Sequence, residues 1–410
     1  MARSFVVGIL LIAVGAVVGF RIGAGQQVPG VSQVLQAIPQ STRLLNIRPS
    51  QDKSSVDFSQ FWEVWRRLET YYFDPEKIDA KKMVYGAIQG MTSALGDPYT
   101  VYLPPEDQKR SMEDLQGSFD GVGIQLGFKN QTLAVVAPLK GHPAEKADVR
   151  AGDLIIRIKD EKKGIDRDTA GITLPEAVDL IRGPKGTTVK LTFLREGGQP
   201  LEKELMRDTI LVPSVELATV EFDGKKAAHL SLSRFGERTN GEWNTAVSQI
   251  ISERSTIKGI VLDMRNNPGG YLQGAIDVAS EFIPNGTVVT QQGRVESQVY
   301  TVNHKGRLID IPIIVLVNKG SASASEIVAG ALRDRRNAKL VGENTFGKGT
   351  VQDAQDDLPG GAGLHITIAR WLLPSGNWIH EKGLAPDVSA VDDVNTADVD
   401  EALQKAVEVL

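Results

Sequence analysis

A serine in the run NKGSASASE (318–326) stands where a nucleophile would have local support. Ser323 follows the apolar segment 311–317 and precedes a helical pattern, which predicts a strand-to-helix turn. Amides at the start of that helix would face the attacked carbonyl, and the helix dipole favours a developing oxyanion. The small neighbour Ala324 leaves room for a substrate backbone. Its spacing to Glu326 also fits a capping box, so a purely structural helix cap is the alternative interpretation.

A serine at its ordinary pKa is a weak nucleophile and needs a base. None of the five histidines lies in a partner motif, whereas Lys348 stands between two glycines in TFGKGTVQ (345–352). Burial would lower its pKa enough for the neutral amine to act as a base. Gln352, four positions on, would share its face in a strand or a helix and orient the amine without adding charge. We predict a Ser323/Lys348 dyad supported by Gln352; a surface lysine in a glycine turn is the alternative.

The segment 342–348 also fits GxxxxGK, the beginning of a phosphate-binding loop. Gly349 stands at the position of the magnesium-binding Ser or Thr, and the following residues lack the apolar periodicity of the required helix. We therefore discount nucleotide binding, which would predict stabilisation against heat by ATP.

A third loop, DMRNNPGG (263–270), follows another apolar run at 258–263. The amide of Gly269 or Gly270, together with that of Ala324, is a candidate for holding the oxyanion. Both apolar runs read as buried strands of an α/β sheet, in which chemistry gathers at the carboxyl ends of strands. The proposed reaction needs neither a metal nor an organic cofactor.

Elements of other types precede this sheet. Apolar residues at helical spacing between 57 and 95 predict two amphipathic helices, which are usually a scaffold or a dimerisation element, with the aromatic stripe in the core. Residues 113–208 alternate as short strands around one helix, which a capping box opens at Thr173.

Composition narrows the function further. The net charge is −5 without any basic run, so nucleic acid is not an expected partner. The absence of cysteine excludes a thiol nucleophile and thiolate metal sites. The apolar run 5–20, flanked by Arg3 and Arg21, would span about 24 Å as a helix. We favour an uncleaved membrane anchor over a cleaved signal peptide, with the catalytic part outside the cytoplasm.

Taken together, these segments resemble the carboxyl-terminal processing peptidases, also called tail-specific proteases. The matching pieces are DMRNNPGG (263–270), NKGSASASE (318–326), VGENTFGKGTVQ (341–352), IARWLLPSGNWIHEKGLAPD (368–387), GVGIQL (121–126) and IRGPKG (181–186). Carried over from the family, Ser323 is the nucleophile, Lys348 the base and Gln352 its partner. Ser321 and Ser325 are then not nucleophiles.

The resemblance implies an α/β fold, with a crotonase-like (ClpP/crotonase-type) protease core, an inserted mainly β PDZ domain and N-terminal helices. It implies a serine endopeptidase that cleaves proteins from or near their C-termini. The expected organisation is a membrane segment (1–25), a linker (26–56), a helical region (57–112), the PDZ domain (113–208), the protease core (209–392) and a C-terminal helix (393–410). The hairpin at 159–170 is longer than typical, and His380 stands where Gln is more usual.

The PDZ expectation also has a physical basis. An extended peptide would add to a strand edge and give its carboxylate to the amides of a glycine loop. The predicted loop and strand residues are Gly121, Val122, Gly123 and Ile124. Val178 on the capped helix would line the opposite wall and receive an apolar terminal side chain, and Arg182 would couple tail binding to the protease core. A catalytically silent PDZ adaptor is the rival function, and a homodimer is one expectation for the N-terminal helices.

Overall fold

The computed structural model describes residues 56–195, 198–392 and 399–410. The chain divides into one unit ending at Ala80 and a second from Lys81 to Leu410. The apolar run predicted as a membrane anchor lies outside the described residues. Within the described part of the chain, no helix has the length and apolar character needed to cross a membrane.

The first unit contains the aromatic helix predicted from the sequence. Helix α3 (Ser59–Tyr71) is followed by the short 3-10 turn η2 (Pro75–Lys77). The expectation that the aromatic stripe forms a core is wrong for α3, because the helix has no buried residue. Phe58 and Trp62 are about 60% exposed, and the rings contact mainly one another, as Phe61 and Trp62 do edge to face. Among the described residues of this unit, the helix has no second layer against which to bury such a stripe.

Three elements open the second unit: helix α4 (Ala80–Ser93), strand β1 (Val101–Leu103) and helix α5 (Pro105–Gln116). A mainly β module follows, as predicted. Its sheet has the order β3-β4-β5-β7-β8, with β6 paired to β5, and a separate ribbon joins β2 to β9. The elements are β2 (Ser118–Gly121), β3 (Ile124–Lys129), β4 (Thr132–Pro138), α6 (Pro143–Lys146), β5 (Leu154–Asp160), β6 (Ile165–Asp168), α7 (Leu174–Ile181), β7 (Thr188–Leu194), β8 (Leu201–Met206) and β9 (Asp208–Leu211).

The module's core explains why these segments form strands. Leu191 and Phe193 of β7 alternate toward one buried cluster that includes residues of α7. Ile155 and Ile158 of β5 both enter this cluster because a register shift between Ile155 and Arg157 interrupts the alternation. The predicted helix start is confirmed, because the Thr173 hydroxyl accepts a hydrogen bond from the Glu176 amide.

The α/β core is built on a six-stranded sheet of order β10-β11-β12-β15-β16-β19. Only β10 and β11 pair antiparallel; the remaining neighbours are parallel. The strands are β10 (Val215–Phe222), β11 (Lys225–Leu232), β12 (Ile260–Asp263), β15 (Ile313–Val317), β16 (Lys339–Gly342) and β19 (Val388–Ser389). Asp263 lies opposite Leu316, and Val317 opposite Gly342, so the loops that follow these three strands leave from one sheet edge.

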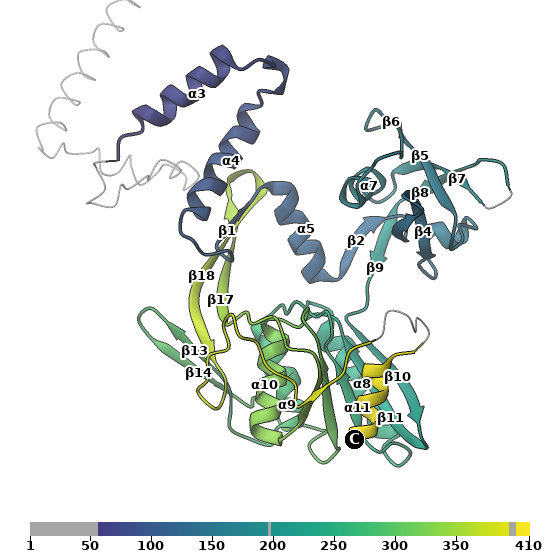
Figure 1. Ribbon diagram of the computed structural model, residues 1–410, viewed down its shortest axis with the longest axis vertical. Coiled ribbons are helices and arrows are strands. Elements are labelled where there is room, and N and C mark those ends of the chain that lie inside the picture. Colours follow the sequence, from purple (N-terminus) through teal and green to yellow (C-terminus); the bar gives the residue numbers. More distant parts are fainter. Residues whose placement is uncertain (1–55, 196–197, 393–398) are drawn as a thin grey trace, which may run out of the picture. The chain divides into compact units, whose positions relative to one another are not determined.

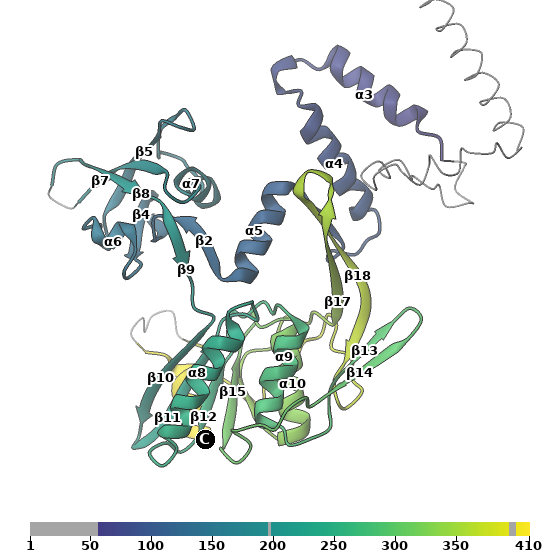
Figure 2. The ribbon, with the colours of Figure 1, turned by 180° about the vertical axis from the view of Figure 1, so that it is seen from behind.

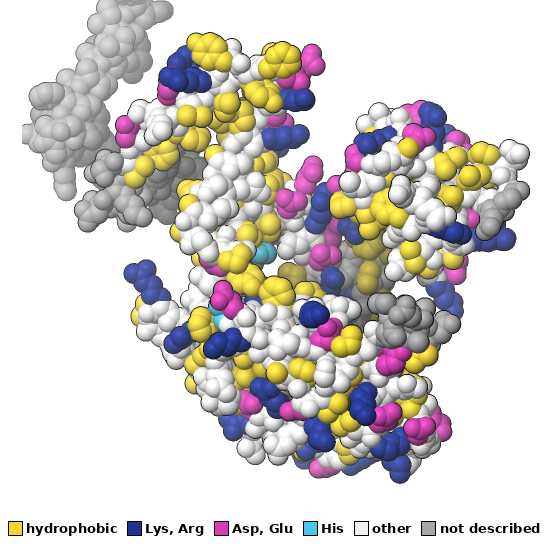
Figure 3. Space-filling model, viewed as in Figure 1, with side chains coloured by type: hydrophobic (Ala, Val, Ile, Leu, Met, Phe, Trp, Pro, Cys, Tyr) yellow, Lys and Arg dark blue, Asp and Glu magenta, His cyan; other side chains and the backbone are white. Residues whose placement is uncertain are grey.

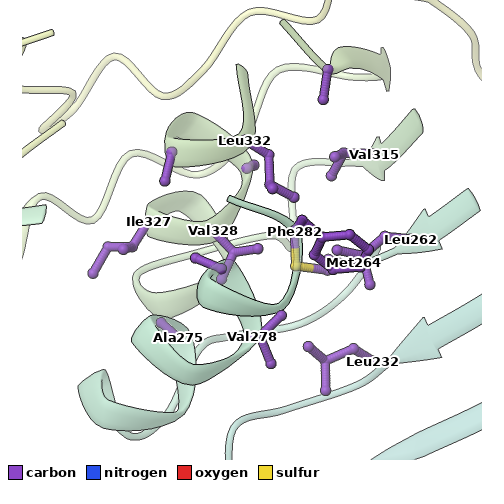
Figure 4. Close-up of a cluster of buried hydrophobic side chains, with 14 of the residues drawn as sticks. Leu232, Leu262, Met264, Ala275, Val278, Phe282, Val315, Ile327, Val328 and Leu332 are labelled. Atoms are coloured by element: carbon purple, nitrogen blue, oxygen red, sulfur yellow. The ribbon is translucent and has the colours of Figure 1, made fainter. Parts of the chain in front are cut away.

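Helices cover both faces of this sheet, which is why its central strands are continuously apolar. Helices α8 (Thr239–Ser252), α9 (Leu272–Phe282) and α10 (Ala324–Arg336) share one buried cluster, whereas α11 (Glu401–Val409) packs with a second cluster on the opposite face. Figures 1 and 2 show α9 and α10 side by side. In Figure 4, Phe282 and Met264 fill the space between these helices and Leu262. This packing fixes the start of α10, where Ser323 lies.

A second sheet supplies another wall near the same edge. Strand β18 pairs with β1, β13 and β17, and β13 also pairs with β14. The elements are β13 (Thr287–Gly293), β14 (Ser297–Thr301), β17 (Thr350–Leu358), the turn η3 (Pro359–Gly361) and β18 (Ala362–Leu372). The mixed α/β core, the mainly β module and the N-terminal helices are as predicted. On the face in Figure 3, basic and acidic side chains of the described residues are interspersed, which agrees with the absence of a basic run.

Candidate active site

Ser323 occupies the turn between β15 and α10, as its sequence position predicted. It is the residue immediately before the helix, with φ +55° and ψ −115°, and its side chain is partly exposed. Positive φ is uncommon outside glycine and costs energy, so the surrounding structure must hold this backbone in place. A strained serine at a strand-to-helix turn presents its hydroxyl at the sheet edge, as an enzyme nucleophile requires.

The buried carboxylate of Glu326 connects this turn to the loop that carries Lys348. Its Oε2 accepts from the amides of Ser323 at 2.8 Å and Lys348 at 2.9 Å. Its Oε1 accepts from the Gly347 amide at 2.7 Å and the Thr345 hydroxyl at 2.6 Å. The sequence indicated Glu326 only as a helix cap. Sequence reasoning missed that Glu326 also joins two loops, because the other groups that donate to it lie about 20 residues further along the chain.

The backbone of the Lys348 loop is held by further side chains. The Trp371 indole donates to the Lys348 carbonyl at 3.0 Å, and the Trp378 indole donates to the Gly349 carbonyl at 2.8 Å. The Gly349 amide donates to Nδ1 of His380 at 3.3 Å. His380, which had no predicted role, thus helps to fix the loop. The main chain on both sides of the lysine is therefore immobilised by tertiary contacts.

The Lys348 side chain lies in partly buried surroundings. Its Nζ is 4.9 Å from the centre of the Tyr99 ring. Burial lowers the pKa of Lys348 below its ordinary value, and the carboxylates of Asp97 and Glu326 offset this only in part. Among the residues that the structure describes, no hydrogen bond or ion pair engages this amine. A lysine with a lowered pKa has the electrostatics that a general base needs.

Gln352 is on β17 and lines the same cavity as Lys348, but its hydrogen bonds are made to two threonines and not to the lysine. Nε2 donates to the Thr350 hydroxyl at 2.9 Å and to the Thr367 hydroxyl at 3.0 Å. Lys348 itself precedes β17, and the β17–β18 register shifts between Val351 and Gln352. Lys348 and Gln352 are therefore not two residues of one regular strand, and the prediction that a spacing of four places them on the same face does not apply to residues 348–352. The two threonines fix the direction of the amide.

The glycine loop lies directly against Ser323. A Cβ added at Gly269 would be 2.8 Å from the Ser323 Cβ and 3.0 Å from the Ala324 amide nitrogen. The Gly269 amide, however, donates to Oδ1 of Asn267 at 2.9 Å. Of the two glycine amides considered, that leaves Gly270 with Ala324 as the pair to face an oxyanion.

The neighbouring serines join the same two loops. Ser321 and Ser325 are fully buried, and their hydroxyls donate to the carbonyls of Met264 at 2.8 Å and Asn267 at 3.0 Å. Both hydroxyls therefore serve as loop ties, and Ser323 is the partly exposed serine of the run.

One cavity of about 500 Å³ brings the predicted site residues together. Ser323, Ala324, Gly269, Gly270, Lys348 and Gln352 all line it. Much of the remaining wall is apolar: Leu272, Ile327, Val351 and Trp371. His365, whose pKa burial lowers, is a further wall residue that the sequence did not single out. Within the described residues no group of His, Cys, Asp and Glu is suited to hold a metal ion.

Comparison with known proteins connects this geometry to a family. The model of peptidase family S41 matches residues 226–390, a PDZ domain model matches 109–194, and the model of the activating protease CtpB N-terminal domain matches 20–107. The carboxy-terminal processing protease CtpA of Bacillus subtilis (strain 168) is 37% identical over 334 residues, 81% of this chain and 69% of that protein. The carboxy-terminal-processing protease of Bartonella bacilliformis is 40% identical over 335 residues, 80% of this chain and 74% of that protein. The chain belongs to peptidase family S41.

The family predicted from the sequence motifs is therefore confirmed: this S41 protease is a carboxy-terminal processing serine protease with a PDZ domain that binds peptide C-termini. A solved structure, of a putative S41 protease from Bacteroides fragilis NCTC 9343, matches with a TM-score of 0.54 at 17% identity. The match covers 77% of this chain and 87% of that one. At that identity the likeness supports the fold alone.

In this S41 protease the predicted PDZ residues surround one strand edge. Gly121 ends β2, Val122 is buried and Ile124 begins β3. Gly123 has φ +75°, and a Cβ there would lie 2.5 Å from the His142 Cβ, so glycine is required. Strand β3 is the last strand of its sheet, so its second edge is unpaired within the described sheet and open to an added strand.

The opposite wall is helix α7, which carries Val178. Arg182 directly follows this helix, with its Nη1 3.5 Å from a carboxylate oxygen of Glu113 on α5. Its guanidinium carbon is 3.9 Å from the centre of the Phe119 ring, a cation–π distance. The predicted coupling residue thus contacts the segment that leads into the PDZ domain.

Proposed function

We propose that this S41 protease cuts protein chains near their C-termini by transferring the acyl group first to Ser323 and then to water. The observation that carries the proposal is the Glu326 clamp, which holds the Ser323 turn and the Lys348 loop together beside one cavity. Lowering of the Lys348 pKa by burial supports its role as the base.

In the first half-reaction, neutral Lys348 accepts the Ser323 proton at Nζ while Oγ forms a bond to the peptide carbonyl carbon. The amides of Ala324 and Gly270 donate to the oxyanion. Protonated Lys348 then returns that proton to the leaving amine as the C–N bond breaks. Water attacks the acyl-enzyme with Lys348 again as the base, which regenerates the Ser323 hydroxyl.

Gln352 has the orienting role in this scheme. Both of its described hydrogen bonds are made by the amide nitrogen, to Thr350 and Thr367. Its carbonyl oxygen then remains to accept an N–H from the Lys348 amine, which would direct the lone pair of the amine toward Ser323. A neutral acceptor does this without the pKa increase that a carboxylate would cause.

The PDZ domain selects the chain end in this proposal. The tail adds to the open edge of β3, its carboxylate meets the amides of the Gly121–Gly123 loop, and its apolar last side chain lies against Val178 of α7. Arg182, in contact with Glu113, couples binding of the tail in the PDZ domain to the activity of the protease core. The apolar lining of the catalytic cavity supports apolar residues at the cut.

We also propose, from the sequence, that residues 1–25 form a single uncleaved membrane anchor and that the protease core is of crotonase type and extracytoplasmic. The exposed aromatic side chains of α3 support a homodimer formed through the N-terminal helices.

The test uses the full-length protein and an unfolded protein substrate that ends in apolar residues. Wild type should cut it and react with a serine-directed phosphonate, Ser323→Ala should do neither, and Lys348→Met should lose cutting. Lys319→Met is the matched control, because Lys319 is an exposed lysine paired with Glu343 and should retain activity. If Lys348→Met still cuts the substrate, the Ser323/Lys348 dyad is refuted. If the wild type binds tails but neither cuts the substrate nor reacts with the phosphonate, the protein is the catalytically silent PDZ adaptor.

A further inference from the structure

The turn at residues 97–100 has no part in the mechanism so far, yet it borders the catalytic cavity. It leads from α4 toward β1, far upstream of the dyad in sequence. Pro98 and Tyr99 line the same cavity as Ser323 and Lys348. A segment that precedes the PDZ domain therefore completes the wall on the lysine side of the site.

Tyr99 lies against the amine of the proposed base. The distance of 4.9 Å from Nζ to the ring centre is within the cation–π range. The Tyr99 ring also packs edge-on against the His380 ring, with centroids 6.1 Å apart. His380 accepts a hydrogen bond from the Gly349 amide, which follows Lys348 in the chain. The Tyr99 ring therefore contacts Lys348 directly and also packs against a side chain that is fixed to the Lys348 loop.

Asp97 holds this turn and joins it to β18. Its Oδ1 accepts from the Tyr99 amide at 3.0 Å and its Oδ2 from the Thr100 hydroxyl at 2.7 Å. The Thr367 amide donates to the Thr100 hydroxyl at 3.0 Å, and the Thr367 hydroxyl accepts from Nε2 of Gln352 at 3.0 Å. Hydrogen bonds thus connect Gln352 to Asp97 by way of Thr367 and Thr100.

We infer that Tyr99 and Asp97 are positioning residues for the Lys348 base: the ring seats the amine, and the carboxylate balances the charge that forms there. The inference rests on the dyad proposed above. When the Ser323 proton moves to Nζ, an ammonium forms in a cavity where desolvation disfavours charge. The aromatic face and the negative carboxylate both favour that charged form, which in the active enzyme with neutral Lys348 appears as the reaction proceeds.

The charge states of the turn suit this role. Burial works against ionisation of Asp97, but hydrogen bonds from Thr367, Thr100 and Tyr99 outweigh it and lower its pKa, so the carboxylate stays negative. Burial raises the pKa of the Tyr99 hydroxyl, with contributions from Glu326 and Asp97, so the ring stays neutral.

The other titratable groups around the amine do not substitute for Asp97. Glu326 also raises the Lys348 pKa, but its oxygens are already occupied by backbone amides and Thr345. His365 and His380 are the nearby imidazoles: burial lowers the His365 pKa, and His380 accepts a backbone hydrogen bond. Asp97 is therefore the carboxylate near Lys348 that is held in place by the turn at residues 97–100, whereas Glu326 is held by the Ser323 and Lys348 loops.

The test is the pH dependence of kcat/KM for peptide cleavage by the full-length protein, in wild type, Tyr99→Phe, Tyr99→Leu and Asp97→Asn. Loss of the ring or of the carboxylate charge makes the lysine a weaker base. The acid limb of the profile should move to lower pH by about half a unit or more in Tyr99→Leu and Asp97→Asn. The plateau kcat should fall about tenfold in both. Tyr99→Phe keeps the aromatic face and should match wild type in both respects.

A merely structural role would lower activity without moving the acid limb, so an unmoved limb in both Tyr99→Leu and Asp97→Asn overturns the inference. If Asp97→Asn does not fold, Asp97 is structural, its share of the inference is lost, and the two Tyr99 variants decide the rest. These outcomes are distinct from failure of the dyad itself, which unimpaired cutting by Lys348→Met would show.

Discussion

The backbone amides of Ser323 and Lys348 donate to the same oxygen atom, Oε2 of Glu326, at 2.8 and 2.9 Å. This shared acceptor fixes the start of α10 relative to the lysine loop. A base and a nucleophile must be held within a fraction of an ångström of a productive geometry. The buried carboxylate supplies that constraint through the main-chain amides that precede the side chains of the proposed nucleophile and base.

Replacing Glu326 should therefore reduce stability and activity together. In Glu326→Gln only one oxygen remains for four donors, and the new NH2 group faces other donors. We expect the free energy of unfolding to fall by about 2 kcal/mol or more and kcat to fall at least tenfold. Denaturant unfolding and peptide cleavage measure the two effects. Glu343→Gln, which removes only the carboxylate paired with exposed Lys319, should change stability by less than about 1 kcal/mol.

Activity should rise with pH as Lys348 loses its proton. Burial lowers the pKa of this lysine in the folded protein, so the acid limb of kcat/KM should lie below the value of about 10.4 for an exposed lysine. Lys348→Arg keeps the positive charge, cannot deprotonate and should lose about 10²–10⁴-fold in kcat. Substantial activity in the arginine variant would contradict a lysine base.

The same pKa shift predicts a pH-dependent stability. Because the folded pKa is below the unfolded one, the unfolded chain binds more protons between the two values, and the Lys348 contribution to stability rises with pH across that window. It is complete above the unfolded pKa and is lost as pH falls through the folded pKa. Lys348→Met removes the cost of burying a charged lysine. The stability of this variant relative to wild type should therefore be greatest at pH values below the folded pKa of Lys348. Denaturant unfolding at several pH values measures this difference.

Gly269 should tolerate no side chain. Its φ is +102°, and a Cβ would approach both Ser323 and the Ala324 amide within about 3 Å. We expect Gly269→Ala to lower kcat at least about 10²-fold by displacing the nucleophile. Gly241→Ala is the control, because a Cβ in that turn of α8 meets no atom within 4 Å. Equal activity in the two variants would show that the nucleophile does not depend on this close approach.

The long hairpin of the PDZ domain should strengthen tail binding. Lys163 on this hairpin donates to the carbonyls of Asp179 and Arg182 at the end of α7. Buried Arg207 donates to the neighbouring Ile181 carbonyl. Lys163→Met should loosen the end of α7 and weaken the binding of a peptide with an apolar C-terminus by about fivefold in Kd. Lys162→Met is the matched control on the same turn, and calorimetry on the full chain measures both.

Arg182 should matter for coupling more than for folding. Its contacts with Glu113 and Phe119 lie at the entry to the PDZ domain. We expect Arg182→Ala to reduce the stimulation of peptide cleavage by a separate apolar tail peptide, with little change in basal cleavage. Unchanged stimulation would end the coupling role, and Lys185→Ala, at an exposed ion pair, is the control.

Local sequence determined which residues are candidates for the chemistry and which elements hold them. Ser323 in a run of small residues after an apolar strand, and Lys348 between two glycines, are recognisable because few residue types support a nucleophile and a neutral base. The cap at Thr173 and the buried strands followed from nearest-neighbour sterics and periodicity. These signals depend on residues a few positions apart.

Tertiary structure decided what those residues meet. The parallel register of β15 and β16, Val317 opposite Gly342, brings the serine and lysine loops to one edge, and core packing sets that register. The contacts of Tyr99 and Trp371 join segments far apart in the chain, and the α3 aromatics are exposed because no described segment covers them. Local periodicity has no access to such contacts, because it records which face of an element is apolar and not which surface covers it.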